Sequence, residues 1–252
     1  MLALAGYPLA QQFQFLDTSA DSPGGQVAPI VTGAFDDPTS LERLAADVDI
    51  VTYEFENVPV SALHAVSRTR PCLPPVEALR VSQDRLYEKE LFTKLGIPTP
   101  PFRAVDSLEG LRAAVAAIGL PAVLKTRRLG YDGKGQHVLR KAADVEAAWA
   151  ALGQAPLILE GFVRFEREVS IIGARSTRGE VRCYPIVDNT HRGGILRVTL
   201  APHRSRALQQ AAERHLQRLL RHFDYAGILT IEFFVHGGRL VANEMAPRVH
   251  NS

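Results

Sequence analysis

Apolar and polar positions along the first third of the chain alternate in short blocks that predict helices and strands in turn. A predicted helix over residues 39–46 precedes a β-rich run over residues 48–55, and residues 59–67 have the spacing of a further helix. Residues 2–10 are typical of the remainder of a first helix. Strands that alternate with helices predict an α/β fold, here part of a doubly wound domain. Because no strand or glycine turn precedes residues 2–10, we expect this domain to lack its first strand.

A proline-rich connector over residues 71–75 follows, and a helix is expected to begin near residue 82 and to end at Gly96. We therefore expect an N-terminal domain over residues 1–82 and a second domain over residues 83–252. In the second domain the pattern predicts helices near residues 111–118, 149 and 208–219, and strands near residues 157–160 and 168–174.

The most informative segment is residues 121–137, where a lysine on a short apolar strand precedes a glycine-rich loop. The three glycines between residues 130 and 135 let backbone amides approach a ligand closely, as phosphate-binding loops do. Lys125 and Lys134 add the positive charge that a triphosphate needs. The loop matches neither a P-loop nor a dinucleotide-binding turn, so we expect a flap between two strands. The alternative is a basic, glycine-rich surface hairpin.

Two carboxylates, Glu232 and Glu244, lie in an otherwise apolar hairpin near residue 252. Buried carboxylates need a cation or a metal as partner, and oxygen ligands suit Mg²⁺. A two-residue turn at 237–238 would place Glu232 opposite Asn243, whereas a three-residue loop centred on Gly238 would place it opposite Glu244. We predict the second arrangement, because one shared metal site needs both acids. The alternative is one inward ligand and one solvated acid on a strand edge.

If the two acids face each other, their mutual repulsion should raise the pKa of at least one of them in the absence of metal.

Composition narrows the class of protein further. The 252 residues are 46% hydrophobic and 22% charged, as expected for an α/β enzyme with one large or two modest domains. The net charge of +2 is small and the arginines are scattered, so we expect no nucleic-acid partner. Only Cys72 and Cys183 are present, without a metal-ligand pattern, which favours reduced thiols in a cytoplasmic protein. No apolar run predicts a membrane span, and the start does not match a signal peptide.

In this order, the lysine strand, the glycine flap and the carboxylate hairpin resemble the ATP-grasp superfamily. Within it, the chain is most similar to the carbon–nitrogen ligases of purine biosynthesis that carboxylate aminoimidazole ribonucleotide. The resemblance covers nearly the whole chain and implies a partial, doubly wound pre-ATP-grasp domain followed by an ATP-grasp domain, whose two α+β subdomains clamp the nucleotide. The segments that carry it are residues 53–57, 83–85, 125, 130–136, 160, 167–170, 191 and 243–252.

The resemblance also implies roles for individual residues. Glu232 and Glu244 would hold Mg²⁺, and Arg248, His250 and Asn251 would be the catalytic residues that receive bicarbonate or carboxyphosphate. The residues implied to bind nucleotide are Arg85, Lys125, Gly130, Tyr131, Asp132, Gly133, Lys134, Gly135, Gln136, Glu160, Gly161, Phe162, Val163, Glu168, His191, Asn243 and Glu244.

Ligases of this kind use ATP to form carboxyphosphate from bicarbonate, which then carboxylates the exocyclic amine of aminoimidazole ribonucleotide. The resemblance therefore implies ATP and Mg²⁺ as cofactors, aminoimidazole ribonucleotide and bicarbonate as substrates, and a cytoplasmic homodimer. Family members have a further strand at the N-terminus and a further domain at the C-terminus, so we expect the chain to be truncated at both ends. Two alternatives stay open: another ATP-grasp ligase of nucleotide metabolism, or a nucleotide-binding fragment without catalytic activity.

Each of these residues also has an ordinary structural interpretation. Glu160 and Glu168 could be charges on strand edges, His191 could be a loop histidine, and Arg85 could lie on a solvated helix face. The residues that apolar spacing places in the core are Tyr53, Phe55, Leu216 and Leu219.

Overall fold

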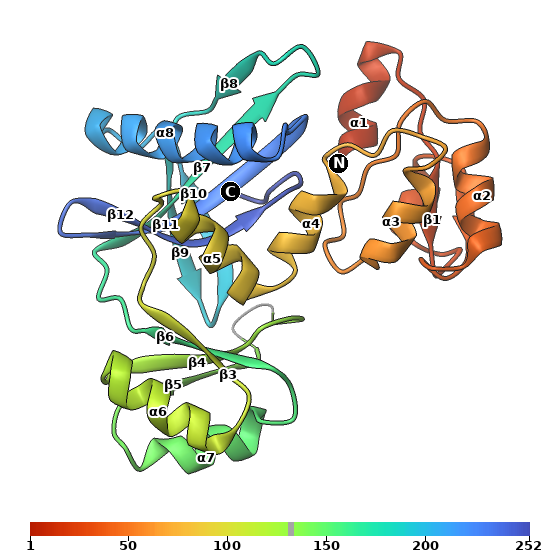
Figure 1. Cartoon of the computed structure of the whole chain (residues 1–252). Helices are drawn as coiled ribbons and strands as arrows, with labels where there is room; N and C mark the ends of the chain where they lie inside the picture. The colour runs from red at the N-terminus through yellow and green to blue at the C-terminus, as the bar shows by residue number, and fades with distance from the viewer. Residues whose placement is uncertain (131–133) are drawn as a thin grey trace. The chain divides into compact units, whose positions relative to one another are not determined.

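A computed structural model describes residues 1–130 and 134–252 of the protein (Figure 1). The chain divides into two compact units, residues 1–79 and residues 80–252. All the residues predicted to bind a ligand belong to the second unit. Within the described residues, no helix combines the length and the apolarity needed to cross a membrane.

The first unit is built around a small parallel sheet of two strands. Its core includes Leu41, Val51 and Leu63. The elements in chain order are α1 (Leu2–Gly6), η1 (Tyr7–Leu9), β1 (Phe15–Asp17), η2 (Pro23–Gln26), β2 (Ile30–Thr32), α2 (Pro38–Ala46), α3 (Val60–Val66) and α4 (Val76–Ser82), within which the two units divide.

The strand predicted over residues 48–55 is wrong, because this segment forms only a single bridge between Val51 and Cys72. Tyr53 is buried as expected, but Phe55 is 53% exposed and is not a core residue. In a strand, positions two apart share a face. Without the strand, nothing keeps Tyr53 and Phe55 on the same side.

The second unit contains two antiparallel sheets and their helices. Its elements are α5 (Arg85–Lys94), β3 (Phe102–Val105), α6 (Leu108–Ile118), β4 (Ala122–Thr126), β5 (Gln136–Leu139), α7 (Asp144–Leu152), β6 (Leu157–Gly161), β7 (Arg167–Arg175), β8 (Val181–Cys183), β9 (Val187–Arg192), β10 (Ile195–Leu200), α8 (Arg206–His222), β11 (Gly227–His236) and β12 (Arg239–Ala246).

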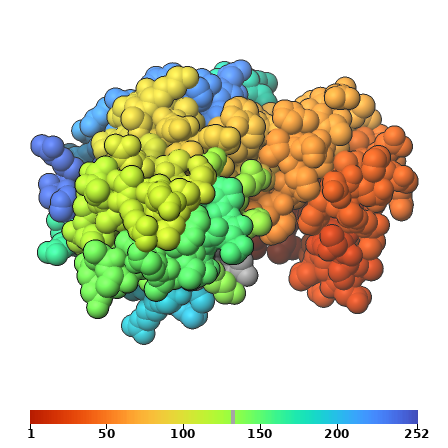
Figure 2. All heavy atoms as spheres, turned by 60° about the horizontal axis from the view of Figure 1, so that its bottom comes forward, coloured from red at the N-terminus to blue at the C-terminus, as the bar shows by residue number. Residues whose placement is uncertain are grey.

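The smaller sheet has the strand order β3-β6-β4-β5 and carries the glycine-rich loop. Its core includes Leu111 of α6, Leu124 of β4 and Leu159 of β6, all fully buried. The two helices α6 and α7 cover one face of this sheet, and their residues form the yellow-green and green surface in Figure 2. Because β4 and β5 pair on either side of the loop, the prediction of a flap between two strands is confirmed.

The larger sheet has the order β10-β9-β7-β11-β12, with β8 paired to β7. Its apolar face is covered by α8 (Figure 1), whose Leu216 and Leu219 are fully buried as predicted. A Cβ on Gly173 of β7 would come within 2.3 Å of the Leu216 side chain, so a glycine is needed there for close packing of α8. The opposite face of the sheet carries the polar side chains described below.

The turn between β11 and β12 differs from the prediction. His236 pairs with Arg239, so the turn has two residues, Gly237 and Gly238, at φ of 56° and 70°. Positive φ at both central positions is typical of the tight hairpin turns that favour Gly-Gly. The predicted three-residue loop is therefore wrong.

Glu232 nevertheless lies opposite Glu244, as predicted. The register shifts by one residue between this pair and the next, in which Phe233 lies opposite Ala242. Asn243 is thus an extra residue on β12, which is a β-bulge. The bulge, and not the turn, brings the two acids onto one face of the hairpin.

Candidate functional site

A buried ion pair joins two strands of the smaller sheet. Lys125 Nζ on β4 lies 3.0 Å from Glu160 Oε2 on β6, and Glu160 is only 2% exposed. Because β6 lies between β3 and β4, Glu160 is not a charge on a strand edge. Burial alone would raise the pKa of Glu160, but Lys125 and Lys89 overcome this and lower it to about 2. The site therefore keeps a carboxylate ionised in the protein interior.

Arg85, at the start of α5, contacts both the flap and Glu244, one of the two facing acids of the hairpin. Its guanidinium contacts Glu244 Oε2 at 3.1 Å and donates to the carbonyl oxygen of Gly130 at 3.3 Å. Burial would raise the pKa of Glu244, but the charges of Arg85, Lys125 and Lys89 lower it. The expectation that repulsion raises the pKa is therefore wrong for Glu244, because cations surround it.

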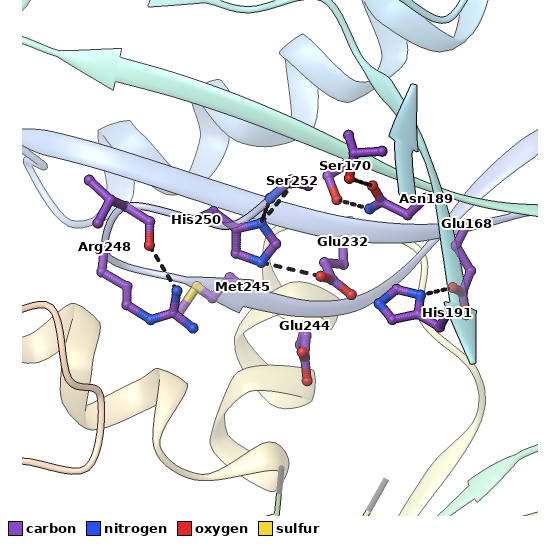
Figure 3. A network of polar contacts seen from close by, with 12 residues as sticks. Glu168, Ser170, Asn189, His191, Glu232, Glu244, Met245, Arg248, His250 and Ser252 are labelled. Carbon is purple, nitrogen blue, oxygen red and sulfur yellow. Dashed lines mark hydrogen bonds and ion pairs between the residues drawn. The ribbon is translucent and has the colours of Figure 1, made fainter. Parts of the chain in front are cut away.

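The polar face of the larger sheet brings together residues of β7, β9 and β11 (Figure 3). The ring nitrogen Nδ1 of His191 contacts the Glu168 carboxylate. Nearby, Asn189 donates to Ser170 Oγ at 2.6 Å and accepts from Thr199 Oγ1 at 3.0 Å. His191 is thus a strand residue and not a loop histidine, and Glu168 lies on a strand that is paired on both sides.

The segment after β12 returns to the same face. His250 Nε2 lies 3.2 Å from Glu232 Oε1, and its Nδ1 lies 2.8 Å from Ser252 Oγ. Figure 3 shows His250 and His191 on either side of Glu232, with Glu244 close by. Arg248 donates to the carbonyl oxygen of Val249 at 2.8 Å.

The remaining predicted residues that the structure describes lie in the flap and at the start of β5 (Lys134, Gly135, Gln136), at or after the end of β6 (Gly161, Phe162, Val163), and on or after β12 (Asn243, Asn251). Gly135, in the flap, has φ of 70°, and a Cβ there would come within 2.6 Å of Thr126 Oγ1, so the position needs glycine. Phe162 is 37% exposed, and Asn251 is exposed. The residues that lie outside the described part of the chain are Tyr131, Asp132 and Gly133.

The metal prediction rests on two acids. Across residues 1–130 and 134–252, no group of three or more His, Cys, Asp or Glu side chains is arranged to hold a metal ion. Glu232 and Glu244, as direct cross-strand neighbours, form an oxygen-only pair on the polar face. Such a pair fits Mg²⁺, which takes one or two carboxylates and completes its octahedron with water and phosphate oxygens.

Sequence reasoning missed two charged residues of α5 that are almost fully buried. Glu88 is 2% exposed and Lys89 is 1% exposed. Burial, with the charge of Glu244, raises the pKa of Glu88 to about 8, although Lys89 opposes the shift. A signal was present, because Arg85, Glu88, Lys89 and Phe92 have the spacing of one buried helix face. Charges at such positions indicate a buried polar network.

Comparisons with known proteins identify the family to which the chain belongs. Residues 90–252 match the family model described as ATP-grasp domain, and residues 1–83 match the Ribonucleotide synthetase preATP-grasp domain. The chain is 51% identical over 252 residues to N5-carboxyaminoimidazole ribonucleotide synthase of Pseudomonas aeruginosa, and the match spans 100% of this chain and 70% of the relative.

Two solved structures show the same fold. The N5-carboxyaminoimidazole ribonucleotide synthetase of Thermus thermophilus superimposes with a TM-score of 0.95 at 51% identity, covering 100% of this chain and 69% of that one. A synthase from Aspergillus clavatus, solved with ADP and 5-aminoimidazole ribonucleotide, gives a TM-score of 0.88 at 26% identity and covers 99% and 67%.

Proposed function

Because the chain belongs to the N5-carboxyaminoimidazole ribonucleotide synthase family and carries an ATP-grasp domain, we propose that it carboxylates 5-aminoimidazole ribonucleotide at the expense of ATP. The product would be 5-(carboxyamino)imidazole ribonucleotide, with ADP and phosphate, in purine biosynthesis. Bicarbonate as the carboxyl source, Mg²⁺ as cofactor and a cytoplasmic homodimer belong to the same proposal.

The observation that carries the proposal is that cationic and carboxylate side chains lie in contact with one another in the second unit. Lys125 pairs with Glu160 on the smaller sheet, while Arg85 contacts both the flap at Gly130 and Glu244 of the larger sheet. Phosphate oxygens are alternative partners for both cations, and charge-assisted hydrogen bonds to them are strong. This arrangement supports a nucleotide whose phosphates lie near Lys125 and Arg85, under the flap.

A second support concerns the base and ribose. Glu160 Oε1 is buried and has no hydrogen-bond partner among the described residues. A buried carboxylate oxygen without a donor is unfavourable, and a ligand that supplies one would remove that penalty. We place the adenine against residues 160–163, and the ribose near Glu168 and its partner His191.

Glu232, Glu244 and the residues after β12 would bind the groups that take part in phosphoryl transfer. Glu232 and Glu244 would hold Mg²⁺, which neutralises charge on the transferring phosphoryl group when bound. His250 is oriented by its contact with Glu232, so its ring lies beside this position. Arg248 offers the planar set of donors that suits a carboxylate, and we assign bicarbonate and carboxyphosphate to Arg248, His250 and Asn251.

Phosphate release from ATP tests the proposal directly. The purified protein should release phosphate at a rate that depends on both 5-aminoimidazole ribonucleotide and bicarbonate, with one carboxylated product for each phosphate. Replacing the ribonucleotide by another amine is the control for a different ligase of the superfamily. Stimulation by the other amine, or nucleotide binding with no release under any condition, would contradict the proposed reaction.

A further inference from the structure

The free edge of β12 is covered by side chains of α5 in place of another strand. Met245 N donates to Glu88 Oε1 at 2.6 Å, and Lys89 Nζ donates to the carbonyl oxygens of Ala242 at 3.1 Å and Asn243 at 2.5 Å. Unpaired backbone groups on a buried strand edge need such partners. Two neighbouring residues of one helix therefore provide partners of β12 around its bulge, beside the carbonyl oxygen of Pro98, which accepts from Ala242 N at 2.7 Å.

The contacts of Lys89 are specific to the bulged backbone. In a regular strand, successive carbonyl groups point to opposite sides, so one ammonium group cannot reach two of them in sequence. Lys89 contacts the carbonyls of Ala242 and Asn243, which are successive. Asn243 is the extra residue of the bulge, where the strand backbone is bent. The ammonium group thus binds a backbone arrangement that exists only in the shifted register.

The Lys89 ammonium group also contacts Glu160, one of the residues proposed to bind the nucleotide. Lys89 Nζ lies 3.7 Å from Glu160 Oε2, with both side chains almost completely buried. A buried ammonium group is stable only where its hydrogen bonds and counter-charges are fixed. Here Glu160 on β6 and the bulge on β12 together fix the place of Lys89.

We propose that Lys89 and Glu88 are positioning residues that hold the bulge at Asn243, and so keep Glu244 opposite Glu232. Continued from the two-residue turn without a bulge, the register would place Asn243 opposite Glu232 and turn Glu244 to the other face. The inference rests on the proposed function of the two acids as the Mg²⁺ site. It adds two residues of α5, a helix far from β12 in the sequence, on which that site depends.

The first experiment measures how nucleotide binding depends on Mg²⁺, by calorimetry with ADP over a range of Mg²⁺ concentrations. Mg²⁺ should strengthen ADP binding, and the Mg²⁺ concentration that gives half of this effect should be about tenfold higher in Lys89→Met and in Glu88→Met than in wild type. A loss of this size is typical when a residue that holds a metal ligand in place is replaced. Glu88→Gln keeps an acceptor for Met245 N and should behave as the wild type does. Leu219→Ala is the matched control, because it opens a cavity on the opposite face of the same sheet and should leave the Mg²⁺ requirement unchanged.

A second experiment reads the register without any ligand. Cysteines at positions 232 and 244, with Cys72 and Cys183 replaced by serine, should form a disulfide when an oxidant is added, because directly opposite residues of two antiparallel strands have Cα atoms about 4.5–5.5 Å apart, which a disulfide can span. Adding Lys89→Met or Glu88→Met should slow this cross-linking, and Glu88→Gln should not. If Lys89→Met fails to fold, the two Glu88 variants still give the comparison.

An unchanged Mg²⁺ requirement and unchanged cross-linking in the folded methionine variants would overturn the inference. If instead the wild-type protein shows no Mg²⁺-dependent nucleotide binding, the proposed function fails. The cross-linking experiment would still decide whether Glu88 and Lys89 hold the bulge.

Discussion

Lys125 Nζ lies 3.0 Å from Glu160 Oε2 inside the smaller sheet, with Lys89 3.7 Å from the same oxygen. Two ammonium groups therefore share one carboxylate in a region that solvent scarcely reaches. An excess of buried positive charge is unfavourable unless an anion balances it. This relationship supports the proposed triphosphate site, because phosphate oxygens would give the two ammonium groups further anionic partners.

Lys125→Met should weaken nucleotide binding by about 1.5–3 kcal/mol, because it removes one charge-assisted contact to phosphate and keeps most of the side-chain volume. Calorimetric titration with ATP and Mg²⁺ measures the change. Lys141→Met is the matched control, since Lys141 is exposed and lies beyond the end of β5. Equal affinities for the wild type and Lys125→Met would remove Lys125 from the nucleotide site.

Long, regular elements were predictable from the sequence, and short or bent ones were not. The spacing of Leu208, Leu216 and Leu219 predicted α8, because a helix of this length repeats its apolar period several times. Strands β1 and β2 have three residues each, too few to show an alternation. The glycine loop was identified as a flap because it follows a lysine on a short apolar strand and matches neither a P-loop nor a dinucleotide-binding turn.

The bulge at Asn243 could not be predicted from the hairpin alone. Its partners, Glu88 and Lys89, precede it by more than 150 positions along the chain. The Gly-Gly sequence is typical of the tight turn that the structure has, whereas tertiary contacts decide the register beyond it. The facing pair of acids was predicted correctly, but from an incorrect loop.

Glu232→Gln and Glu244→Gln should both raise the Mg²⁺ concentration needed for phosphate release. The increase should exceed the roughly 10- to 100-fold that is typical when a residue supporting a metal ligand is replaced, because here the proposed ligands themselves change. The two variants should differ without metal. Gln at 232 can still accept from His250, so the free energy of unfolding should be unchanged, whereas Gln at 244 leaves the Arg85 charge without its carboxylate. Urea unfolding in EDTA measures this difference. Equal stability losses in both variants would contradict the assigned contacts.

Arg127→Lys should destabilise the base of the flap. Arg127 binds both oxygens of Asp84, at 3.0 and 2.7 Å, and stacks on the Tyr87 ring at 5.2 Å. Lysine cannot reproduce a two-pronged contact or the stacking, and a loss of about 1.5–3 kcal/mol is expected. Asp84 also caps α5 by accepting from Leu86 N.

A double-mutant cycle with Asp84→Asn separates the Arg127 contact from the cap, because asparagine keeps a capping oxygen. Urea unfolding of the four proteins should give a coupling energy similar to the loss in Arg127→Lys. Simple additivity of the two single changes would show that the pair does not stabilise the fold.

His215 should make the protein less stable as the pH falls below neutral. Its ring lies on α8 at 5.8 Å from the Phe233 ring, and its Nδ1 is buried without a hydrogen-bond partner among the described residues. Burial, aided by the charges of Arg218 and Arg214, lowers its pKa from 6.5 to about 4. Between these values the unfolded chain binds a proton that the folded protein excludes, so acidification favours unfolding.

His215→Leu should remove this part of the pH dependence. Between pH 7.5 and about pH 5 the free energy of unfolding of wild type should fall by about 1–3 kcal/mol relative to that of His215→Leu, as measured by urea unfolding across this range. Glu88, whose raised pKa adds stability as the pH falls from about 8 towards 4.5, acts equally in both proteins and cancels in the comparison, and the lowered pKa of Glu160 removes stability only as the pH falls from 4.5 towards 2. His222→Leu, at the exposed end of the same helix, is the control and should leave the pH dependence as in wild type. An identical slope in His215→Leu and wild type would mean that His215 can take up a proton in the folded protein without penalty.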